Sequence, residues 1–139
     1  MTILPYEHHA QYYETDQMGI VHHSNYIRWM EEARIDFMKQ AGLSYRKMEE
    51  LGIVIPVLEV QCAYHSMVRF DDTVEILTRL TAYNGVKLAL SYEMRNTAGG
   101  TLCTSGSSRH CFLTPQHRPL SLKRSFPDLH EKFIELLEI

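Results

Sequence analysis

The chain has 139 residues, of which 45% are hydrophobic and 22% are charged. A chain of this length buries roughly 68% of the surface that it exposes when unfolded, so it can form a core without disulfides or metals. This excludes intrinsic disorder, collagen-like repeats and a disulfide scaffold. Lys and Arg number 14 and Asp and Glu number 17, and this net charge of −3 argues against a general nucleic-acid binder.

The cysteine count and the hydropathy pattern indicate in which cellular compartment the protein is expected. The three cysteines, Cys62, Cys103 and Cys111, are an odd number without a CxxC pair, which favours a reduced chain over a secreted one. The N-terminus lacks a basic-then-apolar leader, and no apolar run is long enough to span a membrane. We expect one soluble cytoplasmic domain over residues 1–139, without a membrane partner.

The N-terminal half is expected to be mainly helical. An aromatic-rich strand over 6–13 is followed by a polar loop and then by a helix over 24–41, whose apolar residues recur at three- and four-residue steps. Ser24 is the expected N-cap, and Gly42 ends this helix in a left-handed conformation. A second, short helix is expected over 44–51, closed by Gly52.

After Pro56 the hydrophobic period changes from helical spacing to two. Alternating patterns predict strands over 58–65, 74–80 and 87–95, and a longer strand over 101–114, with turns at Asn84-Gly85 and at 98–100. Residues 125–137 are expected to form a final helix. Antiparallel strands that cover one long helix with one face define an α+β fold.

The segment from Tyr12 to Tyr26 holds most of the chemistry-bearing residues. It contains two carboxylates, Glu14 and Asp16, a glycine turn at Gly19, and the pair His22-His23 directly before the long helix. The first turn of a helix presents free N–H groups and a positive dipole end, which can stabilise the oxyanion of an attacked carbonyl. A carboxylate brought back by Gly19 could attack that carbonyl or activate a water, so acyl transfer to water is indicated.

Plainer interpretations of these residues stand beside that one. Asp16 in a loop before a helix is often only a turn or cap residue, and His22-His23 has no third metal ligand at a diagnostic spacing. We therefore expect no metal site, and in the absence of a Gly-rich phosphate loop no nucleotide cofactor. His8 and His9 are expected on the surface.

The stretch Tyr13-Glu14-Thr15-Asp16-Gln17-Met18-Gly19-Ile20-Val21-His22-His23-Ser24-Asn25-Tyr26, followed by Glu31-Glu32-Ala33-Arg34, resembles the hot-dog-fold acyl-CoA thioesterases. The 4-hydroxybenzoyl-CoA thioesterase and YbgC-like branch is the most similar. The resemblance implies a long helix wrapped by a curved antiparallel sheet, an acyl-CoA substrate, and a homo-oligomer. Dimers of this kind place the active sites between subunits and often stack into tetramers.

The resemblance also implies roles for individual residues. Asp16 falls on the catalytic carboxylate, and His23 falls on the position whose main-chain N–H polarises the thioester carbonyl. Tyr12 falls where a tyrosine lines the site, while Gly19 and Val21 belong to the loop and oxyanion region. A basic run that meets the CoA phosphates in some relatives is replaced here by Lys87 beside Asn84-Gly85-Val86, with Arg95, Arg109 and Arg118 as other candidates.

The leading hypothesis is a homo-oligomeric acyl-CoA thioester hydrolase in which Asp16 is the nucleophile or general base. Thioesters suit such a small site because a thiolate leaves without strong protonation. The alternatives are a thioesterase for acyl carrier protein, a hot-dog dehydratase or hydratase, and a non-catalytic protein that binds acyl thioesters.

Overall fold

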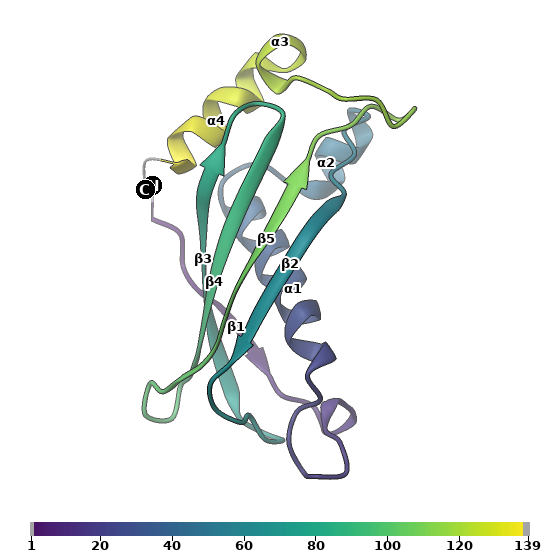
Figure 1. Cartoon of the computed structure of the whole chain (residues 1–139). Helices are drawn as coiled ribbons and strands as arrows, with labels where there is room; N and C mark the ends of the chain where they lie inside the picture. Colours follow the sequence, from purple (N-terminus) through teal and green to yellow (C-terminus); the bar gives the residue numbers. More distant parts are fainter. Residues whose placement is uncertain (1, 138–139) are drawn as a thin grey trace.

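A curved antiparallel sheet wraps one side of a long helix in the computed structural model, which describes residues 2–137 (Figure 1). The strands are β1 (Tyr6–His9), β2 (Val57–Tyr64), β3 (Thr73–Tyr83), β4 (Lys87–Asn96) and β5 (Leu102–Cys111). The helices are the short 3-10 helix η1 (Tyr12–Glu14), α1 (Ser24–Gln40), α2 (Tyr45–Glu50), α3 (Leu122–Ser125) and α4 (Pro127–Leu137). The expected α+β class and the long helix under the sheet are confirmed.

The five strands are all antiparallel and lie in the order β1-β3-β4-β5-β2. Two hairpins join β3 to β4 and β4 to β5, and their turns use Gly85, Gly99 and Gly100 at φ values of 87°, 104° and 74°. These φ values lie in the left-handed region that glycine adopts at little cost. Within the described chain, β2 pairs only with β5, so its other side is a free edge.

The core forms between α1 and the inner face of the sheet. Trp29 and Met30 of α1 are 0% and 1% exposed, and they meet inward-facing residues such as Ile76, Leu90 and Met94, each 0% exposed. Strand residues two apart face the same side, which is why the alternating patterns in β3 and β4 supply this surface. The period-two prediction therefore identified the core face correctly.

The run of small residues in the middle of β5 lies against the Met30 side chain of α1. A Cβ added to Gly106 would collide with Met30 Cε and would lie 2.6 Å from the main-chain oxygen of Gln61 in β2. Glycine at this point therefore lets the helix and the sheet come into direct contact.

Two predictions near the N-terminus are wrong. The first strand ends at His9 rather than at residue 13, because Ala10 turns to pair with Asp71 and Asp72 through bonds of 3.1 and 2.8 Å, and η1 follows. Ser24 is the first residue of α1 and not its N-cap, which is His23. The Ser24 hydroxyl instead contacts His22 Nδ1 at 2.9 Å.

The C-terminal part also differs from the prediction. The last strand ends at Cys111 rather than at residue 114. The expected helix over 125–137 is present as α4 but begins at Pro127, and the short helix α3 directly before it was not expected. Phe126 lies between them with φ −140°, and Pro127 begins α4, where the missing proline N–H is no loss. In α4, Phe133 stacks on Tyr83 of β3 with ring centroids 4.9 Å apart.

Both helix ends that were predicted from glycines are confirmed. Gly42 follows α1 with φ 76°, and Gly52 follows α2 with φ 83°. The three cysteines are free thiols, and Cys103 is buried in the core. No helix in the described part of the chain is both long and apolar enough to cross a membrane.

Candidate active site

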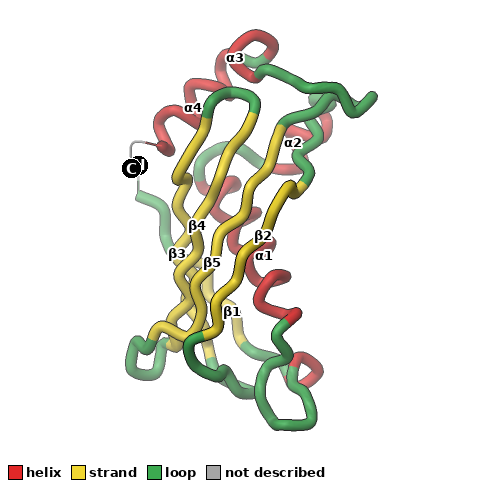
Figure 2. Tube along the Cα trace, in the orientation of Figure 1, coloured by secondary structure: helices red, strands yellow, loops and turns green. Residues whose placement is uncertain are grey.

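The residues between η1 and α1 form a tight loop at one end of the molecule (Figure 2). The base of the loop closes where Thr15 bridges Val21 and the Asp16 N–H donates to the Ile20 carbonyl at 2.8 Å. Gly19 makes the reversal with φ 78°, and its N–H donates to the Asp16 carbonyl at 3.0 Å. The local turn predicted from Gly19 is therefore present, and it folds Asp16 back toward the start of α1.

Asp16 stands between two hollows of the surface. One is a cavity of about 310 Å³, lined by the loop, the start of α1 and the segment after β2: Asp16, Met18, Ile20, Val21, His23, Tyr26, Tyr64, His65, Ser66 and Met67. The other is an open depression that Asp16 shares with Tyr12, Gly19 and Phe70. The Asp16 carboxylate accepts a hydrogen bond from the Met18 N–H at 2.8 Å, which orients the side chain.

His23 is the N-cap of α1 and lines the cavity, so the N-terminus of this helix lies at the cavity wall. The His23 carbonyl accepts a hydrogen bond of 3.0 Å from the Tyr64 hydroxyl, and its ring stacks on His22 with centroids 4.2 Å apart. Its main-chain N–H has no acceptor among the described residues, whereas the neighbouring His22 N–H donates to the Glu14 carbonyl at 2.8 Å. A free N–H at the positive end of a 17-residue helix is suited to an oxyanion.

Two tyrosines line the same cavity as protonated phenols. Burial raises the pKa of Tyr26 and of Tyr64 to about 12, so both side chains are hydroxyl donors at neutral pH. Their rings meet edge-on with centroids 5.2 Å apart. A hydrogen bond of 2.8 Å from the Val21 N–H to the Val68 carbonyl connects the loop to the segment that follows Tyr64.

The buried carboxylate of Glu14 connects the loop to the core through hydrogen bonds. Glu14 is only 5% exposed, and it accepts hydrogen bonds from Trp29 Nε1 at 2.7 Å, from the Gln11 N–H at 2.8 Å and from His8 Nε2 at 2.9 Å. Burial by itself raises the pKa of Glu14, but these donors outweigh it and hold the pKa below its ordinary value. Glu14 is therefore an anion that ties the loop to the core.

His8 is not a surface residue, contrary to the prediction. Its side chain is 11% exposed and packs on Trp29 with ring centroids 4.4 Å apart. Its two ring nitrogens face carboxylates, Glu14 at 2.9 Å and Glu32 at 3.2 Å. Both ring nitrogens of His8 therefore have a carboxylate partner, and the side chain connects β1 to η1 and to α1.

The structure brings together most of the predicted site residues. Asp16, Val21 and His23 share one cavity, and Tyr12 and Gly19 share the adjoining depression with Asp16. Lys87 lies elsewhere in the subunit: it lines a separate hollow with Arg109 at the β3–β4 turn, at the opposite end of the sheet from the loop (Figure 1). Among the residues that the structure describes, no cluster of three His, Cys, Asp or Glu could hold a metal ion.

Sequence reasoning missed the cavity wall that Tyr64, His65 and Met67 provide. These residues are far from the loop along the chain. The main-chain hydrogen bond between Val21 and Val68 brings the two segments together, and no local sequence pattern predicts such a bond. The alternation that predicts β2 gave only the position of Tyr64 near a strand end.

The model of the thioesterase-like superfamily matches residues 11–133. A putative acyl-CoA thioesterase, YneP of Bacillus subtilis (strain 168), is 35% identical over 124 residues, which cover 89% of this chain and 90% of that protein. The acyl-CoA thioester hydrolase YbgC of Escherichia coli O157:H7 is 26% identical over 115 residues, covering 82% of this chain and 86% of YbgC.

Solved structures agree over nearly the whole chain. A DHNA-CoA thioesterase from Staphylococcus aureus superposes with a TM-score of 0.90 at 34% identity, covering 95% of this chain and 89% of that one. A hypothetical protein from Thermus thermophilus, TT1821, gives a TM-score of 0.88 at 32% identity, covering 96% and 98%. The chain therefore belongs to the thioesterase-like superfamily and is a thioester hydrolase with the hot-dog fold.

Proposed function

We propose that this protein hydrolyses acyl-CoA thioesters to a carboxylic acid and free CoA, with Asp16 as the nucleophile or general base. The observation that carries the proposal is that Asp16 and His23 line one cavity, where His23 has an N–H without an acceptor among the described residues. The names of the relatives, acyl-CoA thioesterase and DHNA-CoA thioesterase, support CoA as the thiol carrier.

The proposed chemistry uses the loop and the helix start together. The thioester carbonyl oxygen lies against the His23 N–H, which stabilises the negative charge that develops on it. The Asp16 carboxylate attacks the carbonyl carbon, or removes a proton from a water that attacks it. The carbon–sulfur bond then breaks, and the CoA thiolate leaves and takes up a proton. If an acyl-Asp16 anhydride forms, water hydrolyses it in a second step.

The remaining predicted residues have roles around this centre. Gly19 and Val21 hold the shape of the loop, and Tyr12 lines the outer depression beside Asp16. Lys87, next to Arg109 at the far end of the sheet, is proposed to meet CoA phosphates. Because one subunit places Lys87 far from its own Asp16, that contact requires a neighbouring subunit.

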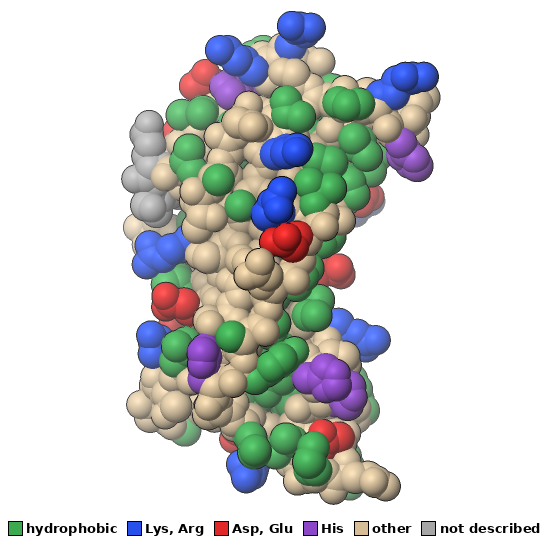
Figure 3. All heavy atoms as spheres, in the orientation of Figure 1, with side chains coloured by type: hydrophobic (Ala, Val, Ile, Leu, Met, Phe, Trp, Pro, Cys, Tyr) green, Lys and Arg blue, Asp and Glu red, His purple; other side chains and the backbone are tan. Residues whose placement is uncertain are grey.

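The free edge of β2 supports the proposal of a homodimer. Val57, Leu58 and Tyr64 of this strand are 49%, 47% and 49% exposed, and Figure 3 shows hydrophobic side chains along this side of the molecule. An unpaired apolar edge strand is a template for pairing with another strand. We propose that β2 pairs antiparallel with β2 of a second copy, and that such dimers stack into a homotetramer.

The free thiols of Cys62, Cys103 and Cys111 support a reducing compartment. We therefore place the enzyme in the cytoplasm, where acyl-CoA is its proposed partner.

Thiol release from a panel of acyl-CoAs tests the function directly. The panel holds short, long, aromatic and hydroxylated acyl groups, and the same acyl groups are also presented on acyl carrier protein. We expect release of CoA thiol from at least one member. Turnover only with acyl carrier protein would replace CoA as the carrier, hydration of an enoyl-CoA without thiol release would indicate a hydratase, and binding without turnover would leave a binding protein.

A further inference from the structure

Asn25, in the first turn of α1, contacts both ends of the loop that bears Asp16. Its side chain is buried, with the residue 8% exposed. Its Nδ2 donates to the Glu14 carbonyl at 2.9 Å and to the His22 carbonyl at 3.2 Å. Glu14 precedes the loop and His22 follows it, so one side-chain amide connects the two ends.

The partners of the Asn25 amide determine which of its atoms faces them. Main-chain carbonyl oxygens only accept, so the amide nitrogen and not the amide oxygen must lie toward both of them. This nitrogen carries two hydrogens, one for each carbonyl. Both hydrogens are therefore committed to the main chain, and Asn25 has no side-chain N–H left to donate to a substrate.

One of these carbonyls belongs to the same peptide group as the His23 N–H. The His22 carbonyl accepts twice from Asn25, because the Asn25 main-chain N–H also donates to it, at 3.0 Å. A peptide group is planar, so fixing its oxygen also fixes the direction of its N–H. Hydrogen bonds in a chain polarise one another, so the two bonds to this oxygen make the His23 N–H a stronger donor.

The neighbouring N–H groups at the helix start are already used. The His22 N–H donates to the Glu14 carbonyl at 2.8 Å, and the Ser24 N–H donates to His22 Nδ1 at 3.2 Å. Among residues 22–25, only the His23 N–H lacks an acceptor in the described part of the chain. The contacts of Asn25 therefore act on the one N–H of this turn that is open to a ligand.

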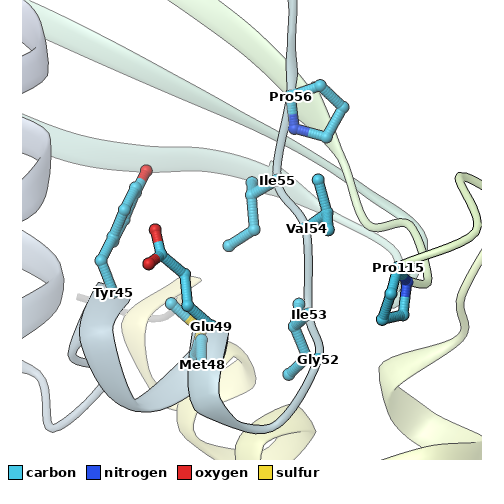
Figure 4. Close-up of a pocket in the computed structure, with 9 residues that line it drawn as sticks. All are labelled: Tyr45, Met48, Glu49, Gly52, Ile53, Val54, Ile55, Pro56 and Pro115. Carbon is cyan, nitrogen blue, oxygen red and sulfur yellow. The ribbon is translucent and has the colours of Figure 1, made fainter.

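A second cavity, between α2 and the residues that lead into β2, is not suited to an oxyanion. It has a volume of about 410 Å³ and mainly apolar walls, and Figure 4 shows the Glu49 carboxylate directed to it. The N–H groups of Ile53 and Val54 in its wall already donate to the carbonyls of Met48 and Leu113, at 3.0 and 2.9 Å. A negative charge that develops there would be repelled by Glu49.

We propose that Asn25 is a positioning residue for the hydrolysis, and that it orients and polarises the peptide group whose His23 N–H stabilises the oxyanion. This inference rests on the proposed function. Asn25 acts only through the His22 carbonyl, while its bond to the Glu14 carbonyl holds the loop with Asp16 against the helix start.

The kinetics of Asn25→Ala test the proposal. Each carbonyl keeps one main-chain donor in this variant, so the chain should fold. We expect kcat for thiol release to fall about tenfold, less than the roughly 100-fold or more that removal of an oxyanion donor costs. KM should stay within about twofold, because the effect grows only as charge develops on the thioester oxygen.

Asn96→Ala is the matched control for the loss of an asparagine side chain. Asn96 Oδ1 accepts from the Ala98 N–H at 3.0 Å in the turn between β4 and β5, and its removal should leave kcat unchanged. Asn25→Asp keeps the shape of the side chain but, as a carboxylate, has no hydrogen to donate. It should be slower than Asn25→Ala, whereas a residue that only fills space would give the reverse order.

The infrared stretching frequency of the thioester carbonyl measures the polarisation without turnover. The probe is the acyl-CoA of the panel that binds most tightly to Asp16→Asn, labelled with a heavy isotope at the thioester carbonyl carbon. Binding to Asp16→Asn should lower the carbonyl frequency relative to the probe in water. Adding Asn25→Ala should reverse much of this shift, and adding Asn96→Ala should leave it in place.

Two results would overturn the proposal: wild-type kcat in a folded Asn25→Ala, or the same carbonyl frequency with and without Asn25. A raised KM at unchanged kcat would also contradict it, because Asn25 would then contribute to substrate binding alone. If Asn25→Ala does not fold, Asn25→Ser, which can donate to only one carbonyl, replaces it in both measurements. If wild type releases no thiol, the proposed function fails, and the carbonyl frequency still decides the role of Asn25.

Discussion

The buried carboxylate of Glu14 holds the candidate active-site loop in place through hydrogen bonds. It accepts from Trp29, His8 and the Gln11 N–H, while its main-chain carbonyl accepts from the His22 N–H and from Asn25 Nδ2 at 2.9 Å. One residue thus fixes both the loop that bears Asp16 and the start of α1. A glutamine amide at this position cannot accept from all three of these donors, because its nitrogen only donates.

Glu14→Gln is therefore expected to lower the free energy of unfolding by about 2 kcal/mol, the scale of hydrogen bonds to a buried charge. Urea denaturation measures the change, and Glu7→Gln, an exposed acid in β1, should leave stability nearly unaltered. Because the folded-state pKa of Glu14 is lowered, its contribution is complete above 4.5 and is lost as the pH falls through the folded value. Equal losses in the two variants would refute this account of Glu14.

His110 predicts a different pH dependence of folding. Burial and the Arg34 charge lower its pKa from 6.5 to about 4, so between these values the unfolded chain binds a proton that the folded chain does not. Stability should fall as the pH drops from 6.5 to 4, by on the order of 3 kcal/mol from this group. Denaturation at several pH values measures the slope, and His110→Gln should flatten it. A slope that stays the same in His110→Gln would assign the titration to other groups.

The sequence predicted those features of the site that depend on residues close together in the chain. Asp16, Gly19 and His23 lie within eight residues, so one turn and one helix start determine their arrangement, and the structure contains that turn. The roles of His8, Arg34 and Tyr64 depend on contacts between residues far apart in the chain. No periodicity encodes such contacts, so His8 was wrongly expected on the surface.

The packing of α1 against the sheet connects the helical and the strand parts of the fold, and α1 lies mainly against β1 and β3. The hydrophobic periods predicted the types of the main elements correctly, because each reflects one buried face. Their ends were less predictable: Phe126 ends α3 and delays the start of α4 to Pro127, and Leu113 leaves the strand to form isolated bridges with Val54 and Pro119. The small run in β5 was visible in the sequence, but its reason, contact with Met30, is tertiary.

Gly106→Ala should destabilise the fold by about 2 kcal/mol, because the added methyl must displace Met30 and meets the immobile main chain of β2. Chemical denaturation measures the loss, and Ser107→Ala in the same strand is the matched control. Equal stability of Gly106→Ala and wild type would show that α1 can move away from the sheet freely.

The free edge of β2 is the proposed contact between subunits. We expect wild type to sediment as a dimer or a tetramer, and Leu58→Lys to shift it toward the monomer, since a charged edge resists pairing. Leu58 is 47% exposed, so the subunit itself should stay folded. Leu4→Lys, at an exposed site near the N-terminus, should retain the wild-type assembly. A monomeric wild type, or an unchanged assembly in Leu58→Lys, would remove β2 from the interface.

Asp16 is the proposed catalytic carboxylate, and the rate of thiol release by Asp16→Asn measures its contribution to the reaction. Asparagine keeps an oxygen that can accept from the Met18 N–H, so the loop retains its shape while the carboxylate charge is lost. Asp36→Asn, on α1 beside Gln40, is the matched control. We predict a fall of kcat/KM by about 100-fold or more in Asp16→Asn and none in Asp36→Asn. Wild-type turnover in a folded Asp16→Asn would contradict the account.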